Sequence, residues 1–186
     1  MKQVEVGITG VTPLLVNRFH EEAQESATSG IRTRKEHLGP KEDAELKLYR
    51  NEHSEPYFPS ENLRQSMISA AARSKIGRRS AQSDAAAALY LEPYCLPILG
   101  EWEVDARPVV IRATGGRIVR YRPIFKDWSL RVRVNVDTDL LPLGLARKIL
   151  DDAGNYVGIG DFRPQRKGPY GRFRVDGWNE LDEVGF

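Results

Sequence analysis

With 186 residues, of which 40% are hydrophobic, the chain is long enough to bury one core, and we expect a single domain over residues 1–186. The formal net charge of +2 does not single out a polyanionic partner, and a single cysteine, Cys95, excludes an intrachain disulfide. The N-terminus lacks a signal-peptide pattern, and no apolar run approaches the ~18 residues of a membrane span, so we expect a cytoplasmic protein without membrane contact.

The N-terminal region predicts a strand, a loop and a short helix. Val4, Val6 and Ile8 alternate with other residues, which predicts a strand that continues into VTPLLVN. Residues 20–40 are polar without a stable period, and we expect a mobile loop there. The next segment, KEDAELKLYRNE, has the pattern of a short and mostly exposed helix.

The segment PYFPSENLRQSMISAAARSKIG predicts a clearer helix. Ser60 is a candidate N-cap, and Gly77 stands where a C-terminal cap belongs. Leu63 and Met67 belong to an apolar stripe that we expect to face the core, which leaves the basic residues of this segment on the outside.

The segment RPVVIRATGGRIVRYRPIF predicts a β-hairpin, and we expect it to form an arm at about residues 104–124. Gly115 and Gly116 supply the turn, and apolar residues alternate with arginines on both strands. The arginines of this predicted arm are Arg107, Arg112, Arg117, Arg120 and Arg122.

The C-terminal part of the chain predicts two strands around one helix. In WSLRVRVNVD the apolar residues face one way, whereas Arg131 and Arg133 face the other. PLGLARKILDDAG reads as a helix with Pro142 near its start and Gly154 after its end. YVGIG predicts a short apolar strand or turn, and YGRFRV predicts the last strand.

Without the loop and the hairpin, the predicted order is β–α–β–β–α–β. This is an α+β fold of the ferredoxin-like or RNA-recognition type, in which two helices cover one face of an antiparallel sheet. We expect the other face to display Arg131, Arg133, Arg172 and Arg174, which would suit a phosphate backbone.

Basic and acidic residues are separated along the chain. Residues 62–83 contain five basic residues and no acid, residues 106–135 contain eight and one acid, and residues 162–174 contain five and no acid. Residues 20–61, by contrast, contain ten acidic residues. Chance clustering on solvated faces is one explanation, but three such windows favour a polyanion site.

The segment GIGDFRPQRKGPYGRF is rich in glycine and basic residues, and the predicted fold places it between the second core helix and the last strand. Glycines let a backbone approach a ligand closely, and successive N–H groups can cradle a phosphate. Phe162 and Tyr170 could stack on bases. The alternative is a tight loop in which the glycines only satisfy turn geometry.

These patterns together predict the residues that contact nucleic acid. They are basic, belong to the glycine-rich segment, or are aromatic residues beside it: Arg73, Lys75, Arg78, Arg79, Arg107, Arg112, Arg117, Arg120, Arg122, Arg131, Arg133, Gly158, Gly160, Phe162, Arg163, Arg166, Lys167, Tyr170 and Arg172.

The predicted element order, the basic hairpin before the third core strand and the late GIG…GPYG loop resemble the RAMP superfamily, the repeat-associated proteins of CRISPR systems. The segment PYFPSENLRQSMISAAA resembles the turn and helix of that superfamily, and the GIGDFRP ending resembles small phage and prophage proteins. The resemblance implies an RNA-contacting glycine loop, a thumb-like hairpin and stacking of subunits along a single strand. It also implies a prokaryotic or phage-infected cell.

We therefore expect a protein that binds single-stranded DNA or RNA and oligomerises along it, with no catalytic residue, cofactor or metal. No nucleophile, phosphate-loop or zinc motif is present. Two alternatives stay open. One is a metal-independent endoribonuclease of the RAMP type with His20 or His37 as general acid or base, and the other is a phage structural or assembly protein.

Overall fold

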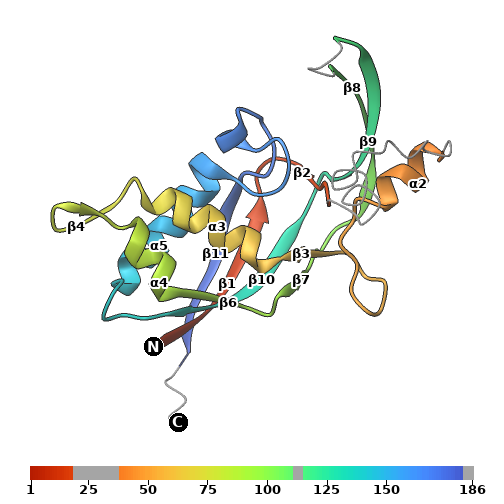
Figure 1. Cartoon of the computed structure of the whole chain (residues 1–186). Helices are drawn as coiled ribbons and strands as arrows, with labels where there is room; N and C mark the ends of the chain where they lie inside the picture. Colours follow the sequence, from red (N-terminus) through yellow and green to blue (C-terminus); the bar gives the residue numbers. More distant parts are fainter. Residues whose placement is uncertain (19–37, 111–114, 182–186) are drawn as a thin grey trace, which may run out of the picture.

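A computed structural model describes residues 1–18, 38–110 and 115–181 (Figure 1). The predicted loop at about 20–40 lies almost wholly outside the described residues, as does Arg112. The central element is a four-stranded sheet in the order β11-β1-β10-β6, with every neighbouring pair antiparallel. Its strands are β1 (Lys2–Gly10), β6 (Leu89–Glu92), β10 (Ser129–Val136) and β11 (Phe173–Leu181).

Helices cover one face of this sheet. They are α3 (Ser60–Ala71), α4 (Gln82–Ala88) and α5 (Leu143–Asp152), and α5 continues into a π turn, η1 (Ala153–Val157). The apolar positions of β1 and β10, including Val4 and Val134, meet Met67 of α3 and Leu150 of α5 in one core, and all four side chains are fully buried. The prediction of an α+β fold built on an antiparallel sheet is therefore confirmed.

A second sheet forms an arm that projects from the body (Figure 1). β8 (Trp102–Val110) and β9 (Arg117–Phe125) pair along their whole lengths as the antiparallel hairpin that the sequence predicts. The short strand β2 (Leu14–Leu15) pairs with the base of β9, where Phe125 is fully buried. The segment VTPLLVN thus leaves the central sheet and anchors the arm, instead of extending the first strand as predicted.

Smaller elements complete the fold. α2 (Pro40–Glu45) is shorter than the helix predicted there, and β3 (Tyr57–Pro59) pairs with β7 (Cys95–Pro97). β4 (Lys75–Ile76) and β5 (Arg79–Ser80) form a second, short hairpin. Among the described residues, no helix is both long and apolar enough to cross a membrane.

Two predicted helix caps are wrong, and the predicted end of the last helix is confirmed. α3 ends at Ala71, and Gly77, with φ +61°, turns the β4–β5 hairpin instead of capping the helix. Ser60 lies inside α3, where its hydroxyl donates to the carbonyl of Leu91, and the residue before the helix is Pro59. Gly154 follows the end of α5, as predicted, and lies within the π turn, where a β-carbon would lie 2.2 Å from the carbonyl oxygen of Phe173.

The glycine loop, residues 158–172, packs tightly against the body. A β-carbon on Gly171 would lie 1.8 Å from the carbonyl oxygen of Ile159, and one on Gly160 would lie 2.6 Å from that of Leu15. Gly158, Gly160 and Gly171 also have positive φ. Internal packing and turn geometry thus account for these glycines, which agrees with the tight-loop alternative. The predicted contact of Gly158 and Gly160 with nucleic acid stays a prediction.

We expect Gly171→Ala to lower the free energy of unfolding by about 2–4 kcal/mol, because it combines a left-handed backbone with a backbone collision. Urea denaturation measures this loss. Gly144→Ala in α5 is the matched control, since nothing lies within 4 Å of a β-carbon there, and it should change stability by less than about 1 kcal/mol. Equal stability of the two variants would contradict this account of the loop.

Candidate nucleic-acid interface

The open face of the central sheet carries Arg131 and Arg133, as predicted, but it also carries acids. Register places Glu5 of β1 opposite Arg133 of β10. The Arg133 guanidinium lies 3.4 Å from the carboxylate of Glu92 and 4.0 Å from that of Glu5. Asp176 of β11 is exposed nearby and accepts a hydrogen bond from Thr9. Cross-strand acids therefore share this face with the predicted arginines and neutralise part of their charge.

Arg172, by contrast, lies outside the open face. It precedes β11, where its backbone N–H donates to the Thr12 hydroxyl at 3.0 Å and its guanidinium donates to the carbonyl of Asn155. These bonds tie the start of β11 to neighbouring turns. The open face consequently has less free positive charge than the sequence pattern indicates.

A second group of predicted contacts surrounds the far end of α3. Lys75, Arg78 and Arg79 are exposed on the β4–β5 hairpin, and Arg79 pairs with the buried Asp84 at 3.0 Å. Arg73 lies over the ring of Tyr156, 4.2 Å from its centroid. Figure 1 shows this hairpin and the arm at opposite ends of the molecule, with the glycine loop between them. The three basic windows therefore do not form one surface.

The arm turns one face toward the glycine loop. In the hairpin register Arg107 stands opposite Arg120, and Asp105 stands opposite Arg122, so these four side chains share a face. On the glycine loop Asp161 pairs with Arg122 at 3.1 Å. The side chain of Arg122 is only 13% exposed, so its charge is used inside the protein and not on a ligand, whereas Arg120 is exposed.

Tyr170, which was predicted to stack on bases, is 9% exposed and packs inside the protein. Its side chain is buried beside Leu15 and Ile124, and the guanidinium of Arg107 lies over its ring, 4.7 Å from the centroid, and donates to its hydroxyl. Arg107 also pairs with Asp105 at 2.9 Å. Arg107 and Tyr170 thus join the arm to the loop.

Phe162 keeps the properties of a stacking residue. Its side chain is 42% exposed, and its ring lies against that of Tyr170 with centroids 6.2 Å apart. Its φ is +48°, a left-handed conformation that is costly for a residue other than glycine. Such strain often accompanies a functional position, and here the strained residue presents an aromatic ring at the surface.

The cations of the glycine loop have two different environments. Arg163 donates to the side-chain oxygen of Gln165 and to the carbonyl of Gly160. Burial lowers the pKa of Arg163 from its ordinary value, Arg166 adds to this effect, and Asp161 opposes it. Arg166 and Lys167 are exposed, as is Arg172 at the end of the loop.

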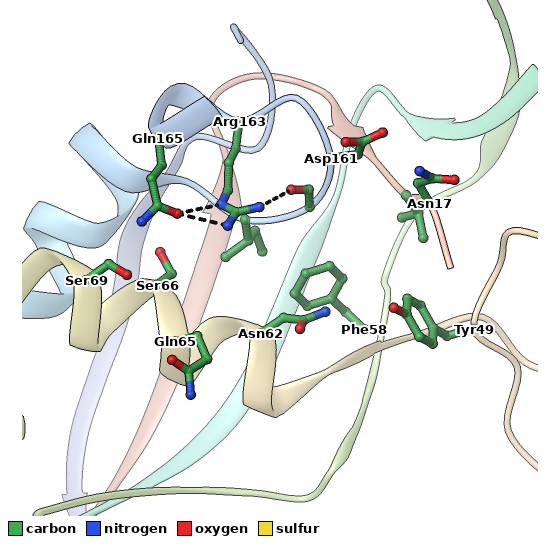
Figure 2. Close-up of a pocket in the computed structure, with 13 residues that line it drawn as sticks. Asn17, Tyr49, Phe58, Asn62, Gln65, Ser66, Ser69, Asp161, Arg163 and Gln165 are labelled. Atoms are coloured by element: carbon green, nitrogen blue, oxygen red, sulfur yellow. Dashed lines mark hydrogen bonds between the residues drawn. The ribbon is translucent and has the colours of Figure 1, made fainter. Parts of the chain in front are cut away.

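Beside the loop lies a polar pocket that charge patterns do not reveal (Figure 2). It has a volume of about 240 Å³, with α3 on one side and the glycine loop on the other. The α3 residues that line it are Asn62, Gln65, Ser66 and Ser69. Their spacing of three, four and seven residues is that of one helix face, and this signal was available in the sequence.

Three tyrosine rings form a row that begins at the pocket. The rings of Tyr49 and Tyr57 have centroids 5.7 Å apart, and those of Tyr57 and Tyr94 are 6.3 Å apart. Tyr49 lines the pocket, and Tyr94 is 60% exposed. Burial raises the pKa of Tyr49 above its ordinary value, and a hydrogen bond with Asn62 partly opposes this. The neutral phenol is therefore favoured at the pocket wall.

No known protein family and no curated protein sequence matches the chain. Among solved structures, the fold is similar to a chain of the Type III-B Cmr-beta complex bound to cognate target RNA. The TM-score is 0.61 at 12% sequence identity, over 97% of this chain and 61% of that chain. The chain thus spans 61% of the length of that structural relative, and the likeness is one of fold.

We expect a coupling energy of about 0.5–1.5 kcal/mol between Arg122 and Asp161, because their ion pair is largely shielded and joins the arm to the loop. A double-mutant cycle with Arg122→Ala and Asp161→Ala, followed by urea denaturation, measures it. Lys126 and Glu103 are the control pair, since both side chains are more than half exposed, and should couple by less than about 0.5 kcal/mol. Equal couplings would show that this ion pair does not hold the arm to the loop.

Proposed function

We propose that this chain binds single-stranded RNA as a RAMP-like subunit, in the region where the arm, the glycine loop and α3 meet. The observation that carries the proposal is the convergence of three features there. They are the exposed cations Arg120, Arg166 and Lys167, the exposed ring of Phe162 and the polar pocket beside α3. Cations hold phosphates, and rings and polar side chains suit unpaired bases.

The fold supports the same proposal at two levels. The chain order β1, α3, β6, β10, α5, β11 and the antiparallel strand order β11-β1-β10-β6 fit the ferredoxin-like class, and we assign the domain to it. The similar chain belongs to a complex bound to target RNA, which favours RNA over DNA as the bound strand. It also favours other subunits of such a complex as partners. A phage single-strand DNA-binding or annealing role is the alternative within the same site.

We further propose a binding role without catalysis. The endoribonuclease alternative depends on His20 or His37, and both lie outside the described residues. The described part of the chain contains no group of three His, Cys, Asp or Glu residues that could hold a metal ion. The candidate site is built from cations, amides, hydroxyls and rings, which suit recognition.

We also propose that copies of the chain associate along the bound strand through the arm. Toward its end the arm exposes Val110, Ile118 and Val119, with exposed side-chain fractions of 60%, 40% and 52%. Val110 and Val119 lie on the face that points away from the Arg107–Arg120 pair. An exposed apolar surface on a projecting element is typical of a protein contact.

Reversing the loop charges with Arg166→Glu and Lys167→Glu should weaken binding to a 30-nucleotide RNA at least tenfold at moderate salt. It should also make the slope of log K against log salt shallower by about 1.4, since two phosphate contacts are lost. Fluorescence anisotropy over a salt series measures both quantities.

The matched control reverses Lys75 and Arg78 on the β4–β5 hairpin, because it changes net charge equally at the opposite end of the molecule. We expect a much smaller effect, caused only by the general field of the protein. An effect as large as that of the loop variant would move the site away from the glycine loop.

Replacing Val119 with Asp should reduce the number of copies that assemble on a 30-nucleotide RNA, because a charge would be placed in the proposed contact. Size-exclusion chromatography with light scattering, with and without RNA, counts the copies. Val11→Asp is the control, since Val11 is 62% exposed but lies outside the arm. Unchanged stoichiometry in the arm variant would remove the arm from the subunit contact.

A further inference from the structure

The pocket between α3 and the glycine loop is lined mainly by neutral groups that both donate and accept hydrogen bonds. Side-chain amides come from three parts of the chain, and Figure 2 labels them among the lining residues together with the α3 serines. The Gln65 amide donates one N–H to the carboxylate of Glu61 at 2.7 Å, which leaves its oxygen and its second N–H outside that bond. An amide offers a carbonyl acceptor and two N–H donors, which is the combination that matches the edge of a nucleobase. The amides are Asn17, Asn62, Gln65 and Gln165.

The charges at the pocket do not favour a phosphate. Its cation, Arg163, already donates to Gln165 and to the carbonyl of Gly160, and the carboxylate of Asp161 also lines the space. The exposed cations Arg166 and Lys167 are not among the lining residues. A phosphate would thus be held at the rim, whereas the interior suits an uncharged polar group.

Apolar side chains also line the pocket. Val16, Phe58 and Ile159 contribute to it and are each about 1% exposed in the folded chain. Because they are almost fully covered, they offer little surface to the face of a ring, so the amides would carry the recognition of its edge. The volume of about 240 Å³ is below that of common drug-sized sites and suits one ring system.

We propose that this pocket holds one unpaired nucleobase of the bound strand and reads its edge through the amides of Asn62 and Gln65. This inference rests on the proposed function, and it adds that each bound chain prefers certain bases at one position. Backbone contacts at the rim would supply affinity without sequence preference, and the pocket would supply the preference.

The test compares four 12-nucleotide strands by fluorescence anisotropy. Three are homopolymers of adenosine, cytidine and uridine, and the fourth is an abasic ribose-phosphate strand. We expect affinities among the homopolymers to differ about fivefold or more, with the abasic strand weakest. The double variant Asn62→Ala and Gln65→Ala should reduce the difference among homopolymers to less than about twofold, while its salt dependence stays that of the wild type.

The matched control is the amide pair on the opposite, open face of the sheet. Gln3 donates to the side-chain oxygen of Asn135 at 2.8 Å, and replacing both residues with alanine removes two amides outside the pocket. This variant should keep the full difference among homopolymers. A control that lost the difference, or a pocket variant that kept it, would overturn the assignment.

The outcomes separate this inference from the proposed function. Tight, salt-sensitive binding of all four strands with equal affinity would overturn the base pocket and leave strand binding intact. If no strand binds, the proposed function fails, and saturation-transfer NMR with the four nucleoside monophosphates tests the pocket alone. Transfer to base protons that the Asn62 and Gln65 variant abolishes would support a nucleotide pocket, whereas absence of transfer would overturn it.

Discussion

The described architecture depends on backbone hydrogen bonds that join the glycine loop to the segment after β1. The N–H of Asp161 donates to the carbonyl of Leu15 at 2.7 Å, and the N–H of Gly171 donates to that of Pro13 at 2.8 Å. The same segment pairs with the base of β9 through Leu14. One short stretch of backbone therefore fixes the loop and the arm together. Because backbone groups make these bonds, side chains of the loop remain available for other contacts.

This constraint explains why several predicted ligand contacts serve the fold instead. Where two elements are held this closely, their facing side chains must pair or be desolvated at a cost. Arg122 pairs with Asp161, and Arg107 covers Tyr170, so polar contacts join the arm to the loop. Ser66 adds a third connection, since its hydroxyl donates to the carbonyl of Gly158 at 2.8 Å and fixes α3 against the loop. The pocket lies between α3 and the glycine loop, next to the bond that Ser66 makes.

Periodicity in the sequence predicted the elements better than it predicted their surroundings. The alternation in β10 and the turn glycines of the arm are local signals, and both elements are present. The pairing of Arg133 with Glu5 is not local, because it depends on register between strands that are far apart in the sequence. Predictions based on charge windows therefore overestimated the free positive surface. The pocket was missed because its α3 residues are uncharged, although their helical spacing was visible.

In the candidate site, the residues suited to phosphates and those suited to bases lie in different places. A strand held only by exposed cations would be bound through its phosphates, and such binding does not distinguish bases. The protein places its exposed loop cations, Arg166 and Lys167, outside the pocket and lines the pocket with amides. Desolvating a neutral amide against a base edge costs less than desolvating a cation, so the amides would read a base at a lower cost than a charged side chain. The proposed strand binding, with a preference at one base per chain, rests on that arrangement.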